Sequence, residues 1–196
     1  MAKLTTAIPA FLKADAWKNQ KIKLYHGTID YYSTGIQTSV DHTQGKPRTD
    51  FAPGFYTTTN LDQAKSWAWD LLGRSIKKKK FAHVAAMLRA EVIEFVVARD
   101  GLATLDTLCF VLGNRNIADF WSFVWHCRNG ATDHQVTFTR NGVTENVYDL
   151  VIGPVASQWR IRQAIQDTDQ FSFHSTNATD VLNDKATTKR VCWSHR

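Results

Sequence analysis

The sequence feature that most constrains the fold is a strand signal that runs directly into a helix start, RTDFAPGFYTTTNLDQAKSWA at residues 48–68. Phe55, Tyr56 and the threonines that follow are aromatic and β-branched residues, which favour a pleated strand. Pro53-Gly54 marks the turn before that strand. The stretch therefore predicts a short strand after a turn, and taken alone Tyr56 is interpreted as a core aromatic.

The helix that follows carries its own start signal. Asn60 is a favourable N-cap, and Gln63 stands where a capping box has its reciprocal partner. Apolar residues then recur at helical spacing, at Leu61, Ala64, Trp67, Ala68, Leu71 and Leu72. Residues 48–72 therefore predict a βα unit, in which a short strand leads directly into a capped amphipathic helix.

Length and composition favour one domain over residues 1–196. A hydrophobic content of 43% is enough for one core, and 196 residues are few for two. The formal net charge of +6 suits a polyanionic partner, but it is also an ordinary route to solubility. The three cysteines, Cys109, Cys127 and Cys192, form no CxxC pair, so neither a zinc site nor a disulfide framework is indicated.

The N-terminal 20 residues predict a helical extension, with a short amphipathic helix over residues 8–19. No apolar segment there reaches signal-peptide length, and Lys13, Asp15 and Lys18 break the stretch, so we expect no signal peptide. No stretch approaches a membrane span. We therefore expect a cytoplasmic protein with no membrane partner.

The remaining elements alternate irregularly between strands and helices, which favours an α+β fold over a doubly wound parallel one. Residues 30–50 show no periodicity and predict a loop. The predicted strands are IKLYHGTI, Val92–Val97, YDLVIGPVA and, as the last strand with alternating faces, DQFSFHS; the predicted helices are IADFWSFVWHC and WRIRQAIQ.

The run Lys77–Lys80 predicts a solvated helix end, with nucleic-acid contact as the sharper alternative. Most of the seven tryptophans, Trp67, Trp121 and Trp125 among them, fit the core faces of helices. His126 and Cys127 are sequence neighbours that do not face each other on a helix, so we interpret both as packing residues.

The sequence lacks the motifs HExxH, GxxxxGK[ST], GxGxxG and GxSxG. The motifs that identify a zincin, a P-loop protein, a Rossmann fold and an α/β-hydrolase are therefore absent. Polar groups next to glycine or an aromatic residue remain at three strand ends. These are Tyr25-His26-Gly27-Thr28, Gly54-Phe55-Tyr56-Thr57 and Asp169-Gln170-Phe171-Ser172-Phe173. Each alone is more often structural than functional.

Taken in order, LYHGT, DFAPGFYTTTNLDQAKSWA, ADFWSFVWHCRNG, YDLVIGPVAS and DQFSFHSTNATDVL resemble the successive blocks of a bacterial family of unknown-function domains in the ADP-ribosyltransferase superfamily. The resemblance runs from about Ile22 to Leu182. One departure is Ala52, where the family usually has a second glycine in DFGxGFY. The resemblance implies an α+β, ADP-ribosyltransferase-like fold, with two small packed β-sheets and flanking helices around an NAD cleft.

The resemblance also implies the roles of the site residues, with NAD as substrate and no metal. His26 would hold a ribose hydroxyl, the backbone of Gly27 would pair with the nicotinamide amide, and Tyr56 would stack on the nicotinamide ring. Gln170 would take the third catalytic position, where many relatives carry a glutamate that bonds the 2′-hydroxyl of the nicotinamide ribose. Further cofactor contacts are assigned to Thr28, Arg48, Phe55 and Thr57.

Gln170 is the chemically weak element, because a neutral amide orients a hydroxyl but cannot stabilise an oxocarbenium-like cation as a carboxylate does. Three alternatives stay open. Another acid assists, with Asp169, Glu145 and Asp50 as candidates; catalysis relies on geometry; or the protein binds NAD without turning it over.

The leading hypothesis is a mono-ADP-ribosyltransferase that acts as a bacterial toxin, in a toxin–antitoxin pair or in phage defence. Its partners would be NAD, a macromolecular acceptor and, left open, an antitoxin or chaperone. The basic balance slightly favours nucleic acid, RNA or DNA, over protein as acceptor. The alternatives are an NAD glycohydrolase and a catalytically silent nucleic-acid- or protein-binding module.

Overall fold

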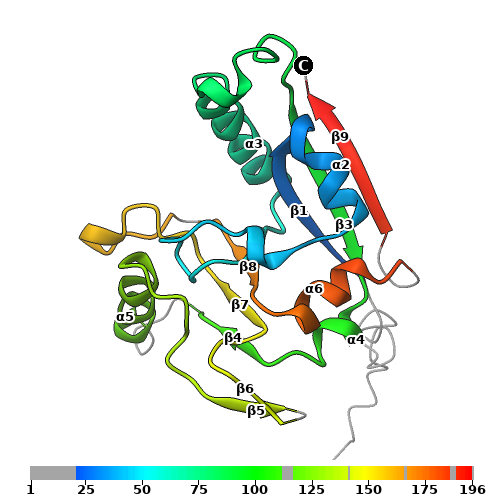
Figure 1. Ribbon diagram of the computed structural model, residues 1–196. Helices are drawn as coiled ribbons and strands as arrows, with labels where there is room; N and C mark the ends of the chain where they lie inside the picture. Colours follow the sequence, from blue (N-terminus) through cyan, green and yellow to red (C-terminus); the bar gives the residue numbers. More distant parts are fainter. Residues whose placement is uncertain (1–20, 112–116, 141, 166, 186–188, 196) are drawn as a thin grey trace, which may run out of the picture.

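The computed structural model describes residues 21–195 except 112–116, 141, 166 and 186–188. The helix predicted for residues 8–19 lies outside the described residues. In the part that is described, the chain is α+β, with two small sheets, one further two-stranded hairpin and helices at their flanks (Figure 1). The expected mixed class is therefore confirmed.

The first sheet has three antiparallel strands in the order β1-β3-β9. The second has the order β2-β8-β7-β4, with β4 parallel to β7 and the other pairs antiparallel. The strands are β1 (Ile22–Ile29), β2 (Phe55–Thr57), β3 (Ala90–Val97), β4 (Thr107–Cys109), β5 (Phe138–Arg140), β6 (Val143–Glu145), β7 (Leu150–Gly153), β8 (Gln170–Phe173) and β9 (Lys189–His195), of which β5 and β6 form the hairpin.

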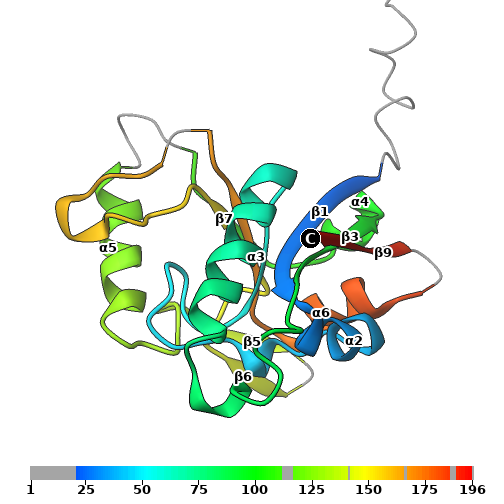
Figure 2. The ribbon, with the colours of Figure 1, turned by 90° about the horizontal axis from the view of Figure 1, so that it is seen from above.

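Helices α2 and α3 lie along the three-stranded sheet, and α5 lies beside the other sheet (Figures 1 and 2). The helices are α2 (Asp30–Thr38), α3 (Leu61–Ser75), α4 (Arg99–Leu102), α5 (Ile117–Arg128) and α6 (Thr176–Asn183). No helix in the described part of the chain is long and apolar enough to cross a membrane.

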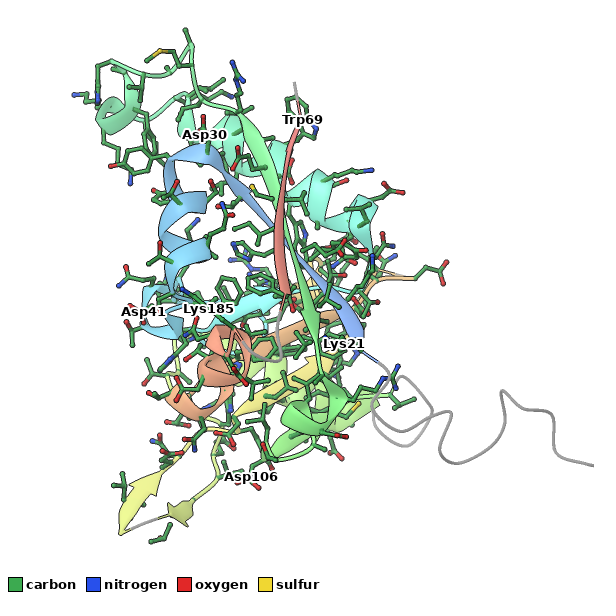
Figure 3. The ribbon with its side chains drawn as sticks, turned by 90° about the vertical axis from the view of Figure 1, so that its right-hand side faces the viewer. Lys21, Asp30, Asp41, Trp69, Asp106 and Lys185 are labelled. Atoms are coloured by element: carbon green, nitrogen blue, oxygen red, sulfur yellow. The ribbon has the colours of Figure 1, made fainter. Side chains whose placement is uncertain are left out.

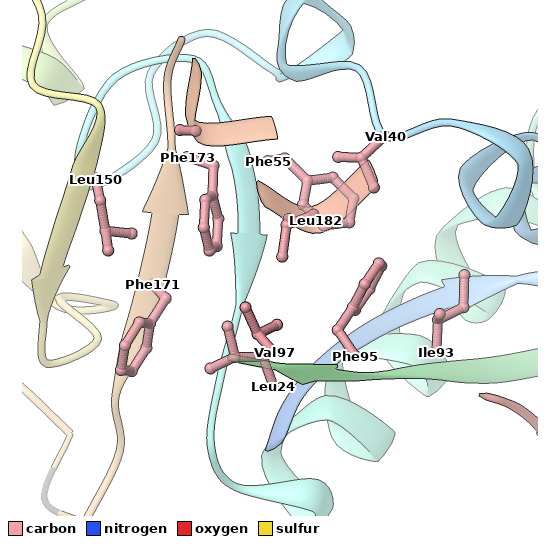
Figure 4. Packing of buried hydrophobic residues seen from close by; sticks show 11 residues of the cluster. Leu24, Val40, Phe55, Ile93, Phe95, Val97, Leu150, Phe171, Phe173 and Leu182 are labelled. Carbon is pink, nitrogen blue, oxygen red and sulfur yellow. The ribbon is translucent and has the colours of Figure 1, made fainter. Parts of the chain in front are cut away.

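The two sheets meet where β1 passes the end of β2. Tyr25 and Thr58 exchange two backbone hydrogen bonds, with Tyr25 N donating to Thr58 O at 2.7 Å and Thr58 N to Tyr25 O at 2.9 Å. Phenylalanine rings from both sheets fill the space between them, together with aliphatic side chains (Figure 4). The junction thus brings β1, β2 and β8 side by side.

Helix α3 approaches the three-stranded sheet very closely. Its contact face is built from Ala64 and Ala68, which pack on Ala90 and Val92. A Cβ atom at Gly27 would lie 2.1 Å from the carbonyl oxygen of Ala64. Only glycine permits this approach.

The strand-to-helix unit at residues 55–75 forms as predicted, since Asn60 Oδ1 accepts hydrogen bonds from the N–H groups of Asp62 and Gln63. The predicted reciprocal bond of the capping box, from the Gln63 side chain back to the Asn60 backbone, was wrong. The Gln63 side chain instead donates to Asp169 O at 2.6 Å and accepts from Asp169 N at 3.3 Å, which ties α3 to the start of β8.

Several other predictions were wrong. Residues 30–38 form helix α2 in place of a loop. Ser33 and Ile36 face the core, and their packing stabilises the helix although Gly35 is a poor helix former. β8 is buried along its whole length and is followed by β9, so it is neither a strand with alternating burial nor the last strand. WRIRQAIQ forms only a 3-10 turn at Trp159–Ile161, and Trp125 is 56% exposed.

Candidate functional site

His26 lies on β1 at the junction of the two sheets. Its Nδ1 is 2.7 Å from the carbonyl oxygen of Tyr56, and its ring stacks on Phe55 with centroids 4.4 Å apart. Because the carbonyl can only accept, Nδ1 carries the proton. Burial lowers the pKa of His26 to about 4, so near neutral pH the ring is uncharged and Nε2 is an acceptor.

Gly27 presents its backbone at the edge of β1. Tyr25 uses its N–H and C=O on the edge away from β3, where they bond Thr58. Alternation along an antiparallel strand directs the N–H and C=O of Gly27 to this same edge. In the part of the chain that the structure describes, β1 is bridged to the β2 segment at Tyr25 and Thr58, and no strand pairing joins Gly27 to β2. A donor and an acceptor therefore lie one residue from the His26 ring.

Tyr56 pairs with Ser172 across β2 and β8. Its hydroxyl accepts a 3.0 Å hydrogen bond from Phe51 N and donates to Ala52 O at 2.6 Å. Burial raises the pKa of the hydroxyl, which stays protonated. The hydroxyl thus fixes the loop before β2, while the ring remains partly exposed.

Gln170, which opens β8, is only 3% exposed. Its Nε2 donates to Asp50 Oδ2 at 2.7 Å and to the carbonyl oxygen of Pro154 at 2.9 Å. Both amide protons are thereby used, and Oε1 is left as the remaining acceptor of the side chain. The orientation of the amide is fixed by its surroundings.

Asp50 is itself held by an ion pair. Its Oδ1 lies 2.7 Å from Nε and 2.5 Å from Nη2 of Arg128, and its Oδ2 also accepts from Ala156 N at 2.9 Å. Its exposure is 4%, so the carboxylate is buried and fully bonded. Arg128 ends α5, 78 residues away in sequence, and no sequence signal linked it to the site.

Of the other acids considered beside Gln170, Asp169 holds the two threonines that precede α3 and its Asn60 cap. It accepts from Thr58 Oγ1 at 2.5 Å and from Thr59 N at 2.8 Å. Glu145 lies on the β5–β6 hairpin, which projects away from β1 (Figure 1). The structure therefore brings Asp50 and Asp169 to Gln170, but not Glu145.

The remaining predicted contacts are placed differently. Phe55 supports the His26 ring. Thr28 and Thr57 are buried at 1% and 0% exposure, so their side chains present no surface to a cofactor. Arg48 is exposed on the loop before β2, where its carbonyl accepts from Arg128 Nη1.

One buried histidine beside the site was not predicted. His174 Nδ1 donates to Pro53 O at 2.8 Å, and no described group bonds its buried Nε2. Its ring lies edge-on to those of Tyr56 and His134. Among the described residues, no group of three histidine, cysteine or acidic side chains could hold a metal ion.

A family model for a protein of unknown function, DUF3990, matches residues 22–194, which hold all of these site residues. The chain belongs to the DUF3990 family. No curated protein and no solved structure matches it. Ala52, where the resemblance led us to expect a glycine, adopts a φ of 67°, a region that favours glycine.

Proposed function

We propose that this DUF3990 chain is a mono-ADP-ribosyltransferase of the ADP-ribosyltransferase superfamily, which binds NAD where β1, β2 and β8 meet. The observation that carries the proposal is the pairing of two features on consecutive residues. His26 offers a neutral Nε2 acceptor held in place through Nδ1, and Gly27 offers a backbone donor and acceptor at the strand edge. A carboxamide and a ribose hydroxyl are complementary to these groups.

In the proposed reaction the bond between C1′ of the ribose and the nicotinamide nitrogen breaks, and its electron pair leaves with nicotinamide. A nucleophilic oxygen or nitrogen of the acceptor forms a new bond to C1′ and releases a proton. The backbone of Gly27 would read the carboxamide, and the Tyr56 ring would face the cationic nicotinamide. His26 Nε2 would accept from a ribose hydroxyl.

Gln170 would act by orientation. Asp50 and Pro154 hold its Nε2, so Oε1 is the atom left to accept a hydrogen bond from the 2′-hydroxyl of the ribose. The carboxylate that bonds the Gln170 side chain is Asp50, and its charge is already paired with Arg128. We therefore expect a slow enzyme that depends on geometry more than on charge stabilisation.

The test is incubation of the purified protein with NAD labelled in its ADP-ribose part and a cell lysate, followed by nuclease or protease treatment. The proposal predicts macromolecular label that needs His26 and is lost in His26→Ala. His83→Ala, at an exposed histidine, is the matched control and should label normally.

Free ADP-ribose without labelled macromolecule would instead identify an NAD glycohydrolase. Neither label nor nicotinamide release would overturn the proposal and favour a silent binding module.

A further inference from the structure

Four basic side chains from three separate segments gather on one surface, and we call them the basic cluster: Lys46, Arg74, Lys78 and Lys80. Lys46 follows the 3-10 helix at His42–Gln44, Arg74 lies in the last turn of α3, and Lys78 and Lys80 belong to the lysine run. Partial burial, and then the positive charges of the other three residues, lower the pKa of Lys46. The charges of Arg74, Lys78 and Lys80 therefore act on Lys46, and Lys80 is itself held in place by a hydrogen bond from its Nζ to the Tyr32 hydroxyl.

The basic cluster has no acidic partner in the part of the chain that the structure describes. The ion pairs there join Lys23 to Glu94, Lys65 to Asp62, His126 to Asp133 and Arg128 to Asp50, and none includes a member of the cluster. All four members are exposed. Like charges held together without compensation favour a polyanionic partner.

Aromatic rings lie directly beside the basic cluster. Lys80 Nζ is 4.5 Å from the ring centroid of Phe81 and 5.3 Å from that of Tyr32, and it donates to the Tyr32 hydroxyl at 2.7 Å. Tyr31 packs edge-on against Tyr32 and Phe81, yet it is 59% exposed. It borders a hollow of about 260 Å³ that Met87 and Leu88 also line. An exposed ring beside cations suits an unstacked base next to its phosphates.

The basic cluster also adjoins the candidate site. A Cβ atom at Gly45 would lie 2.2 Å from the backbone nitrogen of Gly54, so the two backbones are in contact. Lys46 follows Gly45, and Gly54 precedes the strand that carries Tyr56. A chain bound on the basic cluster would therefore reach the loop at the entrance to that strand.

We infer that the basic cluster docks the phosphate backbone of a single-stranded nucleic acid, with Tyr31 as a stacking platform, and that this strand is the acceptor. The inference that the strand is the acceptor rests on the proposed function, whereas binding does not. Exposed cations beside an exposed aromatic ring match the alternating phosphates and bases of a nucleic acid, and a protein acceptor does not require that arrangement.

The first experiment measures binding without NAD, by fluorescence anisotropy of a labelled 20-nucleotide RNA and the DNA of the same sequence. Four phosphate contacts predict a slope of log affinity against log salt of about −2.8, or a roughly 50-fold loss of affinity between 50 and 200 mM salt. Lys46→Gln with Arg74→Gln should bring the slope to about −1.4.

The matched control is Lys21→Gln with Arg99→Gln, which removes the same charge. Lys21 directly precedes β1 and Arg99 follows β3, and these two strand ends lie together because Ile22 pairs with Val97. Asp30, next to Tyr31, lies at the opposite end of β1 (Figure 3). This variant should keep the slope of the unmodified protein. Equal weakening by both variants would overturn the inference, as would tighter binding of a duplex or of a poly-glutamate peptide.

Tyr31→Ala tests the stacking platform and should weaken single-stranded binding about 10-fold without changing the salt slope. Transfer is then tested with the same oligonucleotide and labelled NAD. We expect Lys46→Gln with Arg74→Gln to reduce label on the strand at least 10-fold, while nicotinamide release without acceptor is unchanged. Binding without NAD cleavage would overturn the proposed function, and with it the role of the strand as acceptor, but would leave the docking surface standing. NAD cleavage without strand binding would overturn this inference and leave the proposed function standing.

Discussion

The side-chain amide of Gln170 donates a 2.7 Å hydrogen bond to Oδ2 of Asp50, a carboxylate that Arg128 already pairs through its Oδ1. The position after Asp169 is therefore built for a donor. A carboxylate there would face another carboxylate across the same distance. The neutral side chain at position 170 is therefore explained by the carboxylate of Asp50 that it contacts.

Gln170→Glu should destabilise the protein in a pH-dependent way. Two carboxylates in contact raise the pKa of one of them above its unfolded value, so the protonated pair is tolerated at low pH and its stability is lost as pH rises. Relative to the unmodified protein, we expect an extra loss of about 1–3 kcal/mol in unfolding free energy between pH 4.5 and 7.5. Denaturant unfolding at both pH values measures it.

Gln170→Met is the control, because it removes the hydrogen bonds to Asp50 and Pro154 without adding charge. It should lower the unfolding free energy by the same amount at both pH values. A Gln170→Glu protein that matches the unmodified one in stability at pH 7.5 would show that Asp50 does not fix this amide.

Tyr56 has two roles that different substitutions test: its hydroxyl holds the loop before β2, and its ring is proposed to stack on nicotinamide. Tyr56→Phe leaves the Phe51 N–H without its acceptor, so we expect a loss of about 1–3 kcal/mol in unfolding free energy, with the KM for NAD nearly unchanged. Tyr56→Ala should raise that KM about 30-fold, the equivalent of a desolvated cation–π contact of ~2 kcal/mol. Steady-state nicotinamide release measures both, and equal KM values for the two variants would argue against ring stacking.

Three histidines with lowered pKa values should make the fold sensitive to acid. Burial lowers the pKa of His26 and His134 to about 4 and that of His174 to about 3, so the unfolded chain binds more protons below pH 6.5. Unfolding free energy should therefore fall as pH falls from 6.5 towards 4, by about 1.4 kcal/mol per pH unit for each proton.

His134→Gln tests the assignment, because His134 is fixed through Nε2 to Phe51 O and Nδ1 to Tyr148 N. The variant should reduce that slope by about 1.4 kcal/mol per pH unit, and His83→Gln should not change it. A flat stability profile in the unmodified protein would contradict the assignment of three histidines that stay neutral in the folded state.

Two glycine substitutions should have opposite signs. Gly27→Ala forces a methyl group to within 2.1 Å of Ala64 O and should cost about 1–3 kcal/mol or more as α3 is displaced. Gly35→Ala, at an exposed position of α2 where a Cβ meets nothing within 4 Å, should stabilise by about 0.5–1 kcal/mol. Thermal unfolding compares them, and a tolerated Gly27→Ala would mean that α3 does not need this close approach.

Local signals explain what could be predicted from the sequence. Asn60 and the apolar residues after it fix α3, and the clustered β-branched residues fix β3. Residues 30–38 were missed because α2 owes its stability to packing of Ser33 and Ile36, and Trp125 was misplaced because apolar spacing does not say which face meets a partner. The Asp50–Arg128 pair joins distant segments, which no single-sequence pattern reports.

The most direct measurement is chromatographic detection of nicotinamide released from NAD by the purified protein, the His26→Ala variant and the His83→Ala control. We expect slow release by the unmodified protein and the control, and a loss of at least 100-fold in His26→Ala. No release by the unmodified protein, or equal release by all three, would contradict an NAD site at the junction of β1, β2 and β8.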